Sequence, residues 1–293
     1  MEDFLKKLKT EVLVCDGAMG TMLQENGLSQ GECPEMWNIT HKKVVQSIHR
    51  GYLDAGCNIL ITNTFGGNLF KLRKMGLEDN VHEANIAGAH LAKDVAGDKA
   101  YVLGDIGPTG EFMEPLGELK YEDFYNVFKE QALALRSGGV DGIIIETMSA
   151  LEEIRAAVLA VKENTDLPVV AAMTFQITDS GFRTMMGVDV KKAVTEIKDM
   201  GCDVIGSNCG CGIREMVRVI KEMRRCGGTD GYLIAEPNAG MPRLVDGKTV
   251  FDESPQDMAA FVPELLKEGV KIIGGCCGTT PSHIREIVRA VTG

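Results

Sequence analysis

Two adjacent cysteines near the end of the chain offer the most reactive chemistry in the sequence. Cys276 and Cys277 stand in the stretch IIGGCCGTTP (272–281), with glycines on both sides. Neighbouring side chains of a β-strand point to opposite faces, so an unbroken strand could not aim both thiols at one site. The flanking glycines allow the backbone to leave strand geometry at this point. We therefore expect both cysteines to turn toward a single site.

A third cysteine ends another apolar run, MGCDVIGSNC (200–209). If both runs are strands of one parallel barrel, their ends can meet at its mouth, although Cys209 lies 67 and 68 positions before the pair. Three thiolates with an open fourth position form a catalytic zinc site. Cys211 is an alternative ligand, since spacing alone does not choose, though Cys209 lies nearer the strand end. A redox disulfide between Cys276 and Cys277 is a second alternative.

The remaining cysteines have simpler expected roles. Cys57 and Cys202 stand where related segments carry valine, and Cys15 lies within the first apolar segment, so we expect all three to pack in the core. Cys33 and Cys226 lie in loop-like or helix-end contexts and show no partner. Nine cysteines are an odd number, and the first residues lack a signal-peptide pattern, so a disulfide framework is not expected.

Eight short apolar segments would position these residues. Four of them share one pattern, a glycine and a small apolar residue followed by a mostly polar residue and a β-branched run. The glycine suits the left-handed position just past a helix end, and the run suits a buried strand. The four are 55–65, 138–147, 200–209 and 268–277, and the other segments are 12–17, 101–108, 168–175 and 232–240.

Stretches with helical periodicity separate these segments. The run SALEEIRAAVLAVKE (149–163) places its apolar residues on one face, and Ser149 with Glu152 has capping-box spacing. After the eighth segment, Thr280 can cap a helix whose first residue is Pro281. Strands alternating with helices over 293 residues predict an α/β protein, a (β/α)8 TIM barrel formed as a single domain by residues 1–293. An open doubly wound sheet is the alternative.

Composition excludes several classes of function. The net charge is −11, aromatic residues make up 5% of the chain, and no basic run is present, which argues against nucleic-acid binding. No apolar run approaches the ~18 residues of a membrane span. The first residues, MEDFLKKLKTEVLV, lack a signal-peptide pattern, so we expect a cytoplasmic protein with no membrane partner.

Several motifs resemble those of the homocysteine S-methyltransferase family. They are DGAMGTM (16–22), TNTF (62–65), GDIGPTG (104–110), ETMSALEE (146–153), SNCG (207–210), EPNAGMP (236–242) and GGCCGTTPSHI (274–284). The resemblance covers essentially the whole chain and is strongest to the homocysteine-binding module of cobalamin-dependent methionine synthase. It implies a zinc-dependent barrel that methylates the thiol of homocysteine to give methionine.

The resemblance also assigns the metal ligands. It implies that Cys209, Cys276 and Cys277 hold Zn²⁺, in agreement with the argument from the strand ends. Asn238 would take the fourth zinc position before the substrate arrives. Zinc can deprotonate a coordinating thiol, and the thiolate is the nucleophile.

Substrate contacts are implied in the same way. Asp16 and Glu146 would hold the amino group of homocysteine, and backbone groups near Gly17, Ala18 and Thr174 would fix its carboxylate. An ammonium group needs carboxylates, and both acidic residues end predicted strands. Turn or helix capping is the alternative role for each of them.

Two further acidic residues, Asp105 and Glu236, also end predicted strands. We expect structural roles for them, because buried carboxylates need partners.

The methyl donor is not fixed by these motifs. The family module works beside folate and cobalamin domains, and this sequence contains neither, nor an Asp-x-His-x-x-Gly stretch. We therefore expect methylcobalamin on a corrinoid protein in trans, or on other modules of a longer methionine synthase. Alternatives are an S-methylmethionine-dependent enzyme, a zinc- or thiol-binding module without turnover, and a phosphate-binding barrel lyase. The last is disfavoured because no Lys or Arg closely follows GGCCGTTP.

Overall fold

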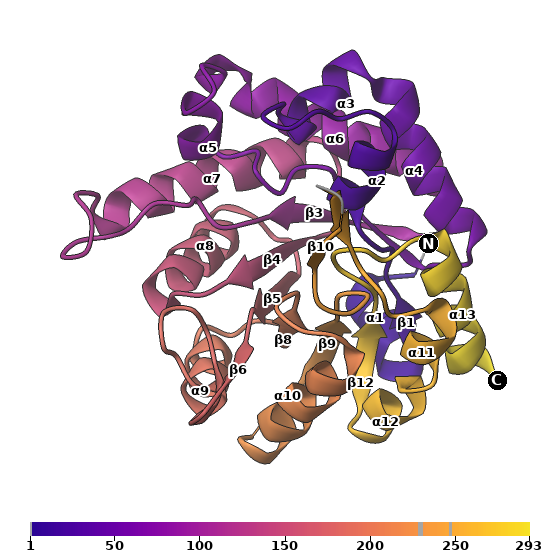
Figure 1. Cartoon of the computed structure of the whole chain (residues 1–293). Helices are drawn as coiled ribbons and strands as arrows, with labels where there is room; N and C mark the ends of the chain where they lie inside the picture. The colour runs from indigo at the N-terminus through magenta and orange to yellow at the C-terminus, as the bar shows by residue number, and fades with distance from the viewer. Residues whose placement is uncertain (1, 228–230, 246–247) are drawn as a thin grey trace.

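A closed sheet of eight parallel strands forms the centre of the protein. The computed structural model describes residues 2–227, 231–245 and 248–293. The strands follow the order β1-β12-β9-β8-β5-β4-β3-β2, and a parallel bridge between Cys15 and Ile59 joins the two ends of this order. Figure 1 shows the strands at the centre with the helices arranged around them. The predicted (β/α)8 barrel is confirmed, and the open sheet is wrong.

All eight predicted segments contain a barrel strand. These strands are β1 (Leu13–Val14), β2 (Ile59–Ile61), β3 (Tyr101–Ile106), β4 (Gly142–Met148), β5 (Val169–Met173), β8 (Val204–Asn208), β9 (Tyr232–Glu236) and β12 (Val270–Ile273). The glycines at 56, 139, 201 and 269 all have positive φ, as the repeated pattern predicted. The strands are buried on both faces, which explains their nearly continuous apolar runs.

The larger helices follow the strands in alternation. The helices that lead from β1 to β5 are α2 (Met19–Glu25), α3 (Trp37–Thr40), α4 (Lys42–Asp54), α5 (Leu69–Arg73), α6 (Val81–Ala96), α7 (Tyr121–Ser137) and α8 (Leu151–Asn164). Those that follow β5 are α9 (Val190–Asp199), α10 (Ile213–Arg225), α11 (Pro255–Ala259), α12 (Val262–Lys267) and α13 (Pro281–Thr292). In the described ranges, no helix has both the length and the hydropathy needed to cross a membrane.

Two apolar cores hold the barrel. The larger core lies between the strands and the surrounding helices. The second fills the barrel interior with side chains such as Ile144, Val204 and Ile272. A helix before the first strand, α1 (Phe4–Thr10), adds Phe4 and Leu8 to this interior core. The barrel is thus packed with side chains, which leaves the other end for chemistry.

One of the two predicted helix caps is wrong. Helix α8 begins at Leu151 after Ala150, and Ser149 does not cap it; the Ser149 carbonyl instead accepts a hydrogen bond from Thr184 Oγ1 at 2.7 Å. Helix α13 begins at Pro281 after Thr280, as predicted. There the Thr280 N–H donates to His283 Nδ1 at 3.1 Å.

The sequence did not predict two hairpins that stand between strands and helices. One contains β6 (Gln176–Thr178) and β7 (Gly181–Arg183), after β5. The other contains β10 (Arg243–Val245) and β11 (Lys248–Val250), after β9. Both follow the carboxyl ends of barrel strands, the end at which such barrels carry their active sites.

His49 should make the fold sensitive to acid. It lies on α4, is fully buried, and neither ring nitrogen has a hydrogen-bond partner. Burial lowers its pKa from 6.5 to about 4. Below pH ~6.5 the unfolded chain therefore binds a proton at this histidine, whereas the folded chain does not. The free energy of unfolding should consequently fall by about 1.4 kcal/mol per pH unit as the pH drops toward 4.

Urea unfolding of His49→Leu at several pH values would measure this. We expect the variant to lose that part of the slope between pH 6.5 and 4. His82→Leu, at an exposed histidine, is the matched control and should keep it. An unchanged slope in His49→Leu would contradict the assignment.

Candidate active site

A cavity of about 270 Å³ opens at the carboxyl ends of the strands. Its lining includes Cys209, Cys276 and Cys277, together with Glu146 and Gly17. These residues come from the ends of β8, β12, β4 and β1. The closed barrel therefore brings together residues that are far apart in the sequence, as the strand-end argument predicted.

The three thiols form a compact group. Their sulfur atoms all lie within 4.8 Å of one another, and the sulfurs of Cys209 and Cys277 are 4.0 Å apart. Ligands of tetrahedral zinc with Zn–S bonds near 2.3 Å have sulfurs about 3.8 Å apart. The donor set and its spacing thus fit Zn²⁺.

The backbone around the pair departs from strand geometry as expected. β12 ends at Ile273, and the chain then turns so that the Thr279 N–H donates to the Cys276 carbonyl at 3.1 Å. A Cβ on Gly275 would lie 2.6 Å from the Thr279 side chain, so only glycine fits there. This turn lets consecutive cysteines share one site.

The thiols share their protons unequally. Hydrogen bonds from Cys276, and then from Cys277, lower the pKa of Cys209 to about 3. The hydrogen bond with Cys209 raises the pKa of Cys277 to about 12, and contacts with Cys209 and Cys277 raise that of Cys276 well above its usual value. Metal binding to such a group releases the thiol protons, because the thiolate is the ligand.

Cys211 does not belong to this group. It is buried, and burial raises its pKa to about 12. Its N–H donates to the Cys209 carbonyl at 2.8 Å. Asn238 does lie beside the thiols, because its side chain hydrogen-bonds Cys209, while its Oδ1 is buried without a partner. An unpartnered amide oxygen at this place suits the expected fourth ligand.

Four carboxyl groups lie at the same end of the barrel. Burial raises the pKa of Glu146 to about 8, with the charge of Cys209 as the second cause. Burial likewise raises the pKa of Asp16, Asp105 and Glu236 well above the usual range. Asp16 Oδ1 and Asp105 Oδ1 have no hydrogen-bond partner, whereas the side chain of Glu236 hydrogen-bonds the Cys15 thiol. The partner expected for Glu236 is thus Cys15, whereas no partner for Asp105 Oδ1 is found among the described residues.

The charged residues that line the cavity are all acidic. No Lys, Arg or His occurs among the described residues that line it, whereas Glu35, Asp105, Glu146 and Glu236 do. Buried acids without cations favour a positively charged ligand, since such a ligand lowers their pKa. An ammonium group and a metal ion both meet this requirement.

The proposed substrate residues are placed differently from one another. Glu146, Gly17 and Ala18 line the cavity, but Asp16 is not among its described lining residues and its Oδ2 accepts from the Ile61 N–H at 2.9 Å. The Ala18 N–H donates to Thr279 Oγ1 at 3.0 Å and is therefore already used.

Thr174 lies in a different cavity. It lines an adjoining space of about 340 Å³, together with Thr147. Because Thr147 also lines the first cavity, the two spaces are neighbours.

Two features of the site were missed by sequence reasoning. Cys33 was expected to have no partner, but its thiol donates to Glu35 Oε2 at 3.2 Å. Glu35 Oε1 also accepts from the Gly66 N–H at 2.6 Å, which fixes this acidic residue in the cavity wall. Asn208, at the end of β8, contacts Glu146 and Thr147 at the end of β4. Its polar side chain at the end of a predicted strand was the signal available in the sequence.

Comparison with known proteins assigns the family. The family model described as homocysteine S-methyltransferase matches residues 13–291. The chain belongs to the homocysteine S-methyltransferase family. This is the family that the resemblance of its motifs implied.

Individual relatives agree with this assignment. The methionine synthases of Mycobacterium tuberculosis and Mycobacterium leprae are 34% and 33% identical, over 99% of this chain. The chain spans only 25% of the length of each. The Escherichia coli homocysteine methyltransferase MmuM, in its oxidized form, has the same fold, with a TM-score of 0.78, 22% identity and 96% of each chain covered.

Removal of a single thiol should separate the ligands from their neighbour Cys211. We expect Cys209→Ala, Cys276→Ala and Cys277→Ala to lose most bound zinc, because two thiols leave the metal short of donors. Cys211→Ala should keep about one zinc per chain. Metal analysis by mass spectrometry after gel filtration would test this. Full zinc content in Cys277→Ala, or its loss in Cys211→Ala, would contradict the assignment.

Proposed function

We propose that this barrel transfers a methyl group to the thiol of homocysteine, giving methionine, with zinc held by Cys209, Cys276 and Cys277. The observation that carries the proposal is the juxtaposition of three thiols with a wall of buried acids in one cavity of about 270 Å³. Homocysteine offers one group for each feature, a thiol and an ammonium. Family membership supports the same acceptor.

The metal and the protein residues would have separate tasks. Zinc, when bound, supplies a Lewis acid with an open position that lowers the pKa of a coordinating thiol. Glu146 would take the ammonium of homocysteine, and Asp16 beside it would add to the negative potential. Ammonium binding returns the raised pKa of Glu146 toward its usual value, so the carboxylate and its ligand stabilise each other. The sulfur would lose its proton and form a bond to the methyl carbon, while the bond from that carbon to the donor breaks and the donor keeps the electron pair.

The cavity is too small to enclose a large methyl donor. Pockets for drug-sized ligands measure roughly 300–1,000 Å³, so a cavity of about 270 Å³ suits a small amino acid. A corrinoid is far larger and would have to stay outside, with only its methyl group reaching the sulfur. We therefore propose that the donor is methylcobalamin presented by a partner protein or by another module of the same protein. The greater length of the relatives supports additional modules.

An apolar rim at the same end of the barrel supports a protein-borne donor. Of the twelve large hydrophobic residues that are exposed in the described part of the chain, nine lie in the connections after β3, β5 and β9. These nine, which we call the apolar rim, are Phe112, Leu116, Ile177, Met185, Met186, Met241, Leu244, Val245 and Val250. Exposed apolar clusters of this kind mark interaction surfaces, and methionines adapt to varied partners.

The rim adjoins the site. Phe112, Met185 and Met186 line the 340 Å³ cavity that also contains Thr147 and Thr174. On the other side, the Ala239 N–H donates to the Cys277 carbonyl at 3.0 Å, just before the hairpin that carries Leu244. A partner seated on the rim would therefore face the proposed metal site.

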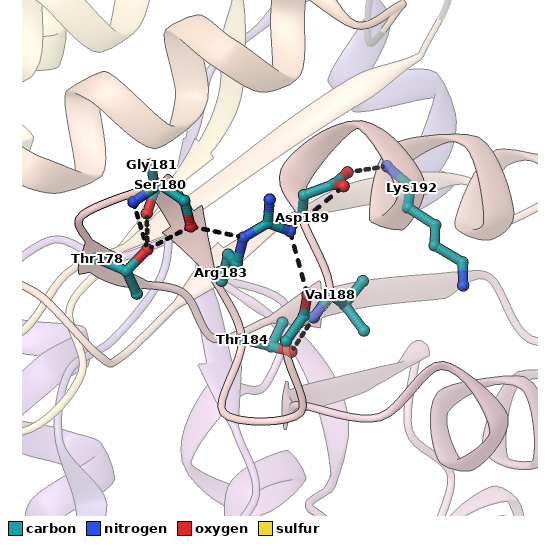
Figure 2. A network of polar contacts seen from close by, with 9 residues as sticks. Thr178, Ser180, Gly181, Arg183, Thr184, Val188, Asp189 and Lys192 are labelled. Atoms are coloured by element: carbon teal, nitrogen blue, oxygen red, sulfur yellow. Dashed lines mark hydrogen bonds and ion pairs between the residues drawn. The ribbon is translucent and has the colours of Figure 1, made fainter.

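The hairpin that carries Ile177 is held firmly although its apolar side chains are exposed. Figure 2 shows the polar network that fixes it. Arg183 donates to Ser180 Oγ at 3.0 Å and pairs with Asp189 at 3.4 Å, while Thr178 Oγ1 donates to the Gly181 carbonyl at 2.7 Å. Asp189 in turn accepts from the Lys192 N–H and caps α9. An ordered platform loses less entropy when a partner binds.

A donor assay tests the proposed function. Zinc-loaded protein should form methionine from homocysteine with free methylcobalamin, because the methyl group alone must reach the sulfur. S-methylmethionine is tested in parallel and should give no turnover. Turnover with S-methylmethionine alone would overturn the proposed donor. The absence of turnover with both compounds, and with every other corrinoid donor tested, would favour a binding module without activity.

Rim variants test how the donor is presented. Ile177→Glu and Leu244→Glu should lower kcat/KM about tenfold when methylcobalamin is bound to a corrinoid protein, because interface anchors are desolvated on docking. Activity with free methylcobalamin should change little. Both positions are exposed, at 56% and 79%, so folding should survive.

The matched control is Leu133→Glu, at an exposed leucine on the outer face of α7. It should leave both activities unchanged. Equal loss with both donors in the rim variants would argue against docking. A wild-type dimer that these variants convert to monomers would show that the rim joins two copies of the chain.

A further inference from the structure

Asn208 lies between the two halves of the site. It ends β8 immediately before Cys209, and its side chain is fully buried. Its carbonyl accepts from Thr174 Oγ1 at 3.0 Å. No role was assigned to Asn208 from the sequence, yet it joins the end of β8 to the end of β4.

Its side-chain amide is fully used. Asn208 Nδ2 donates to Glu146 Oε2 at 3.0 Å and to Thr147 Oγ1 at 2.8 Å, while its Oδ1 accepts from the Thr147 N–H at 2.7 Å. Nδ2 also lies 4.0 Å from Cys276 Sγ, the longest of its contacts, so the amide touches both the acidic residue and the thiols. The amide supplies both kinds of group, since its NH2 donates and its oxygen accepts. Aspartate would lose the donors and add a like charge beside Glu146.

The amide also ties together two strained residues. Thr147 and Cys209 have φ values of 59° and 55°, and they are the two non-glycine residues with positive φ in the described ranges. This conformation is unfavourable, above all for a β-branched threonine, and persists where surrounding contacts enforce it. Asn208 holds Thr147 by both its N–H and its hydroxyl, and it directly precedes Cys209.

We propose that Asn208 is a positioning residue that fixes the carboxylate of Glu146 relative to the three thiols, an inference that rests on the proposed function. Its contact occupies Oε2 of Glu146 and leaves Oε1 for the ammonium of the substrate. The distance between ammonium and thiol in homocysteine is limited by its own carbon chain. The site must therefore hold Glu146 at a fixed distance from the metal ligands. Asn208 does this because it bonds Glu146 and directly precedes Cys209.

The test uses protein loaded with Co²⁺ in place of zinc, whose thiolate absorption bands report on the metal site without turnover. In Asn208→Leu, which keeps a similar volume, the bands before substrate should match the wild type. The homocysteine concentration at the midpoint of the spectral change should rise about 10- to 100-fold, as expected for the loss of hydrogen bonds to a charged group. Asn208→Asp should show at least the same rise.

A double-mutant cycle separates positioning from a general structural role. If Asn208 acts through Glu146, Asn208→Leu should add less than about a twofold change in a Glu146→Gln background. Asn85→Leu is the matched control, because Asn85 is also a fully buried amide, with two carbonyl contacts at 2.7 Å, on α6. It should lower Tm and leave the midpoint unchanged.

Each other outcome overturns the inference. A midpoint within about twofold of the wild type, additive effects in the cycle, or an equal shift in Asn85→Leu would show that Asn208 does not position Glu146. Loss of the cobalt bands before substrate would assign Asn208 to the metal site instead. If wild-type protein shows no spectral response to homocysteine, the proposed function itself fails, and this inference fails with it.

Discussion

Burial of acidic groups without a facing cation is the constraint on which the rest of this structure depends. The carboxyl groups of Asp16, Asp105, Glu146 and Glu236 gather with three thiols at one end of the barrel, and no described residue lining the cavity is basic. Burial raises the pKa of every one of these carboxyls. Such groups are costly to hold inside a protein unless they are neutral or paired. The filled barrel interior, with Phe4 and Leu8 at its other end, supplies the apolar packing that makes this arrangement tolerable.

The same constraint explains why the backbone is strained where it is. A thiol at the end of a parallel strand can point toward the mouth of the barrel only if the backbone turns sharply there. Cys209, immediately after β8, makes this turn with a positive φ. Cys276 and Cys277 use a glycine-flanked turn for the same purpose. Such turns persist because neighbouring strands restrain them, and the Asn208 amide and the Cys209 N–H, which donates to the Glu236 carbonyl at 3.0 Å, are two of these restraints.

The barrel could be predicted because each element carries a local signal. The glycines at 56, 139, 201 and 269 mark helix ends, and the runs after them have the composition of buried strands. Barrel topology then converts strand ends into a site, which is how Cys209 could be joined to the distant pair. The Ser149 cap failed because Ala150 and Ser149 both precede an apolar stripe, and spacing does not fix which residue begins the helix. The hairpins β6–β7 and β10–β11 were missed because short exposed strands lack alternation. Contacts such as Cys33 with Glu35, and Asn208 with Glu146, depend on side chains meeting in space, which no local pattern encodes.

The geometry also separates two demands that a methyltransferase must meet. The acceptor needs a closed, charged cavity, because both its thiol and its ammonium must be held in one orientation. The donor needs access to the acceptor sulfur from outside. Residues at strand ends supply the first, and the connections after β3, β5 and β9 carry exposed hydrophobic side chains at the same end of the barrel. A small sulfonium donor would gain from a lid that excludes water. The proposed donor on a protein would itself cover the mouth, and an apolar rim beside a small acidic cavity offers it a surface to contact.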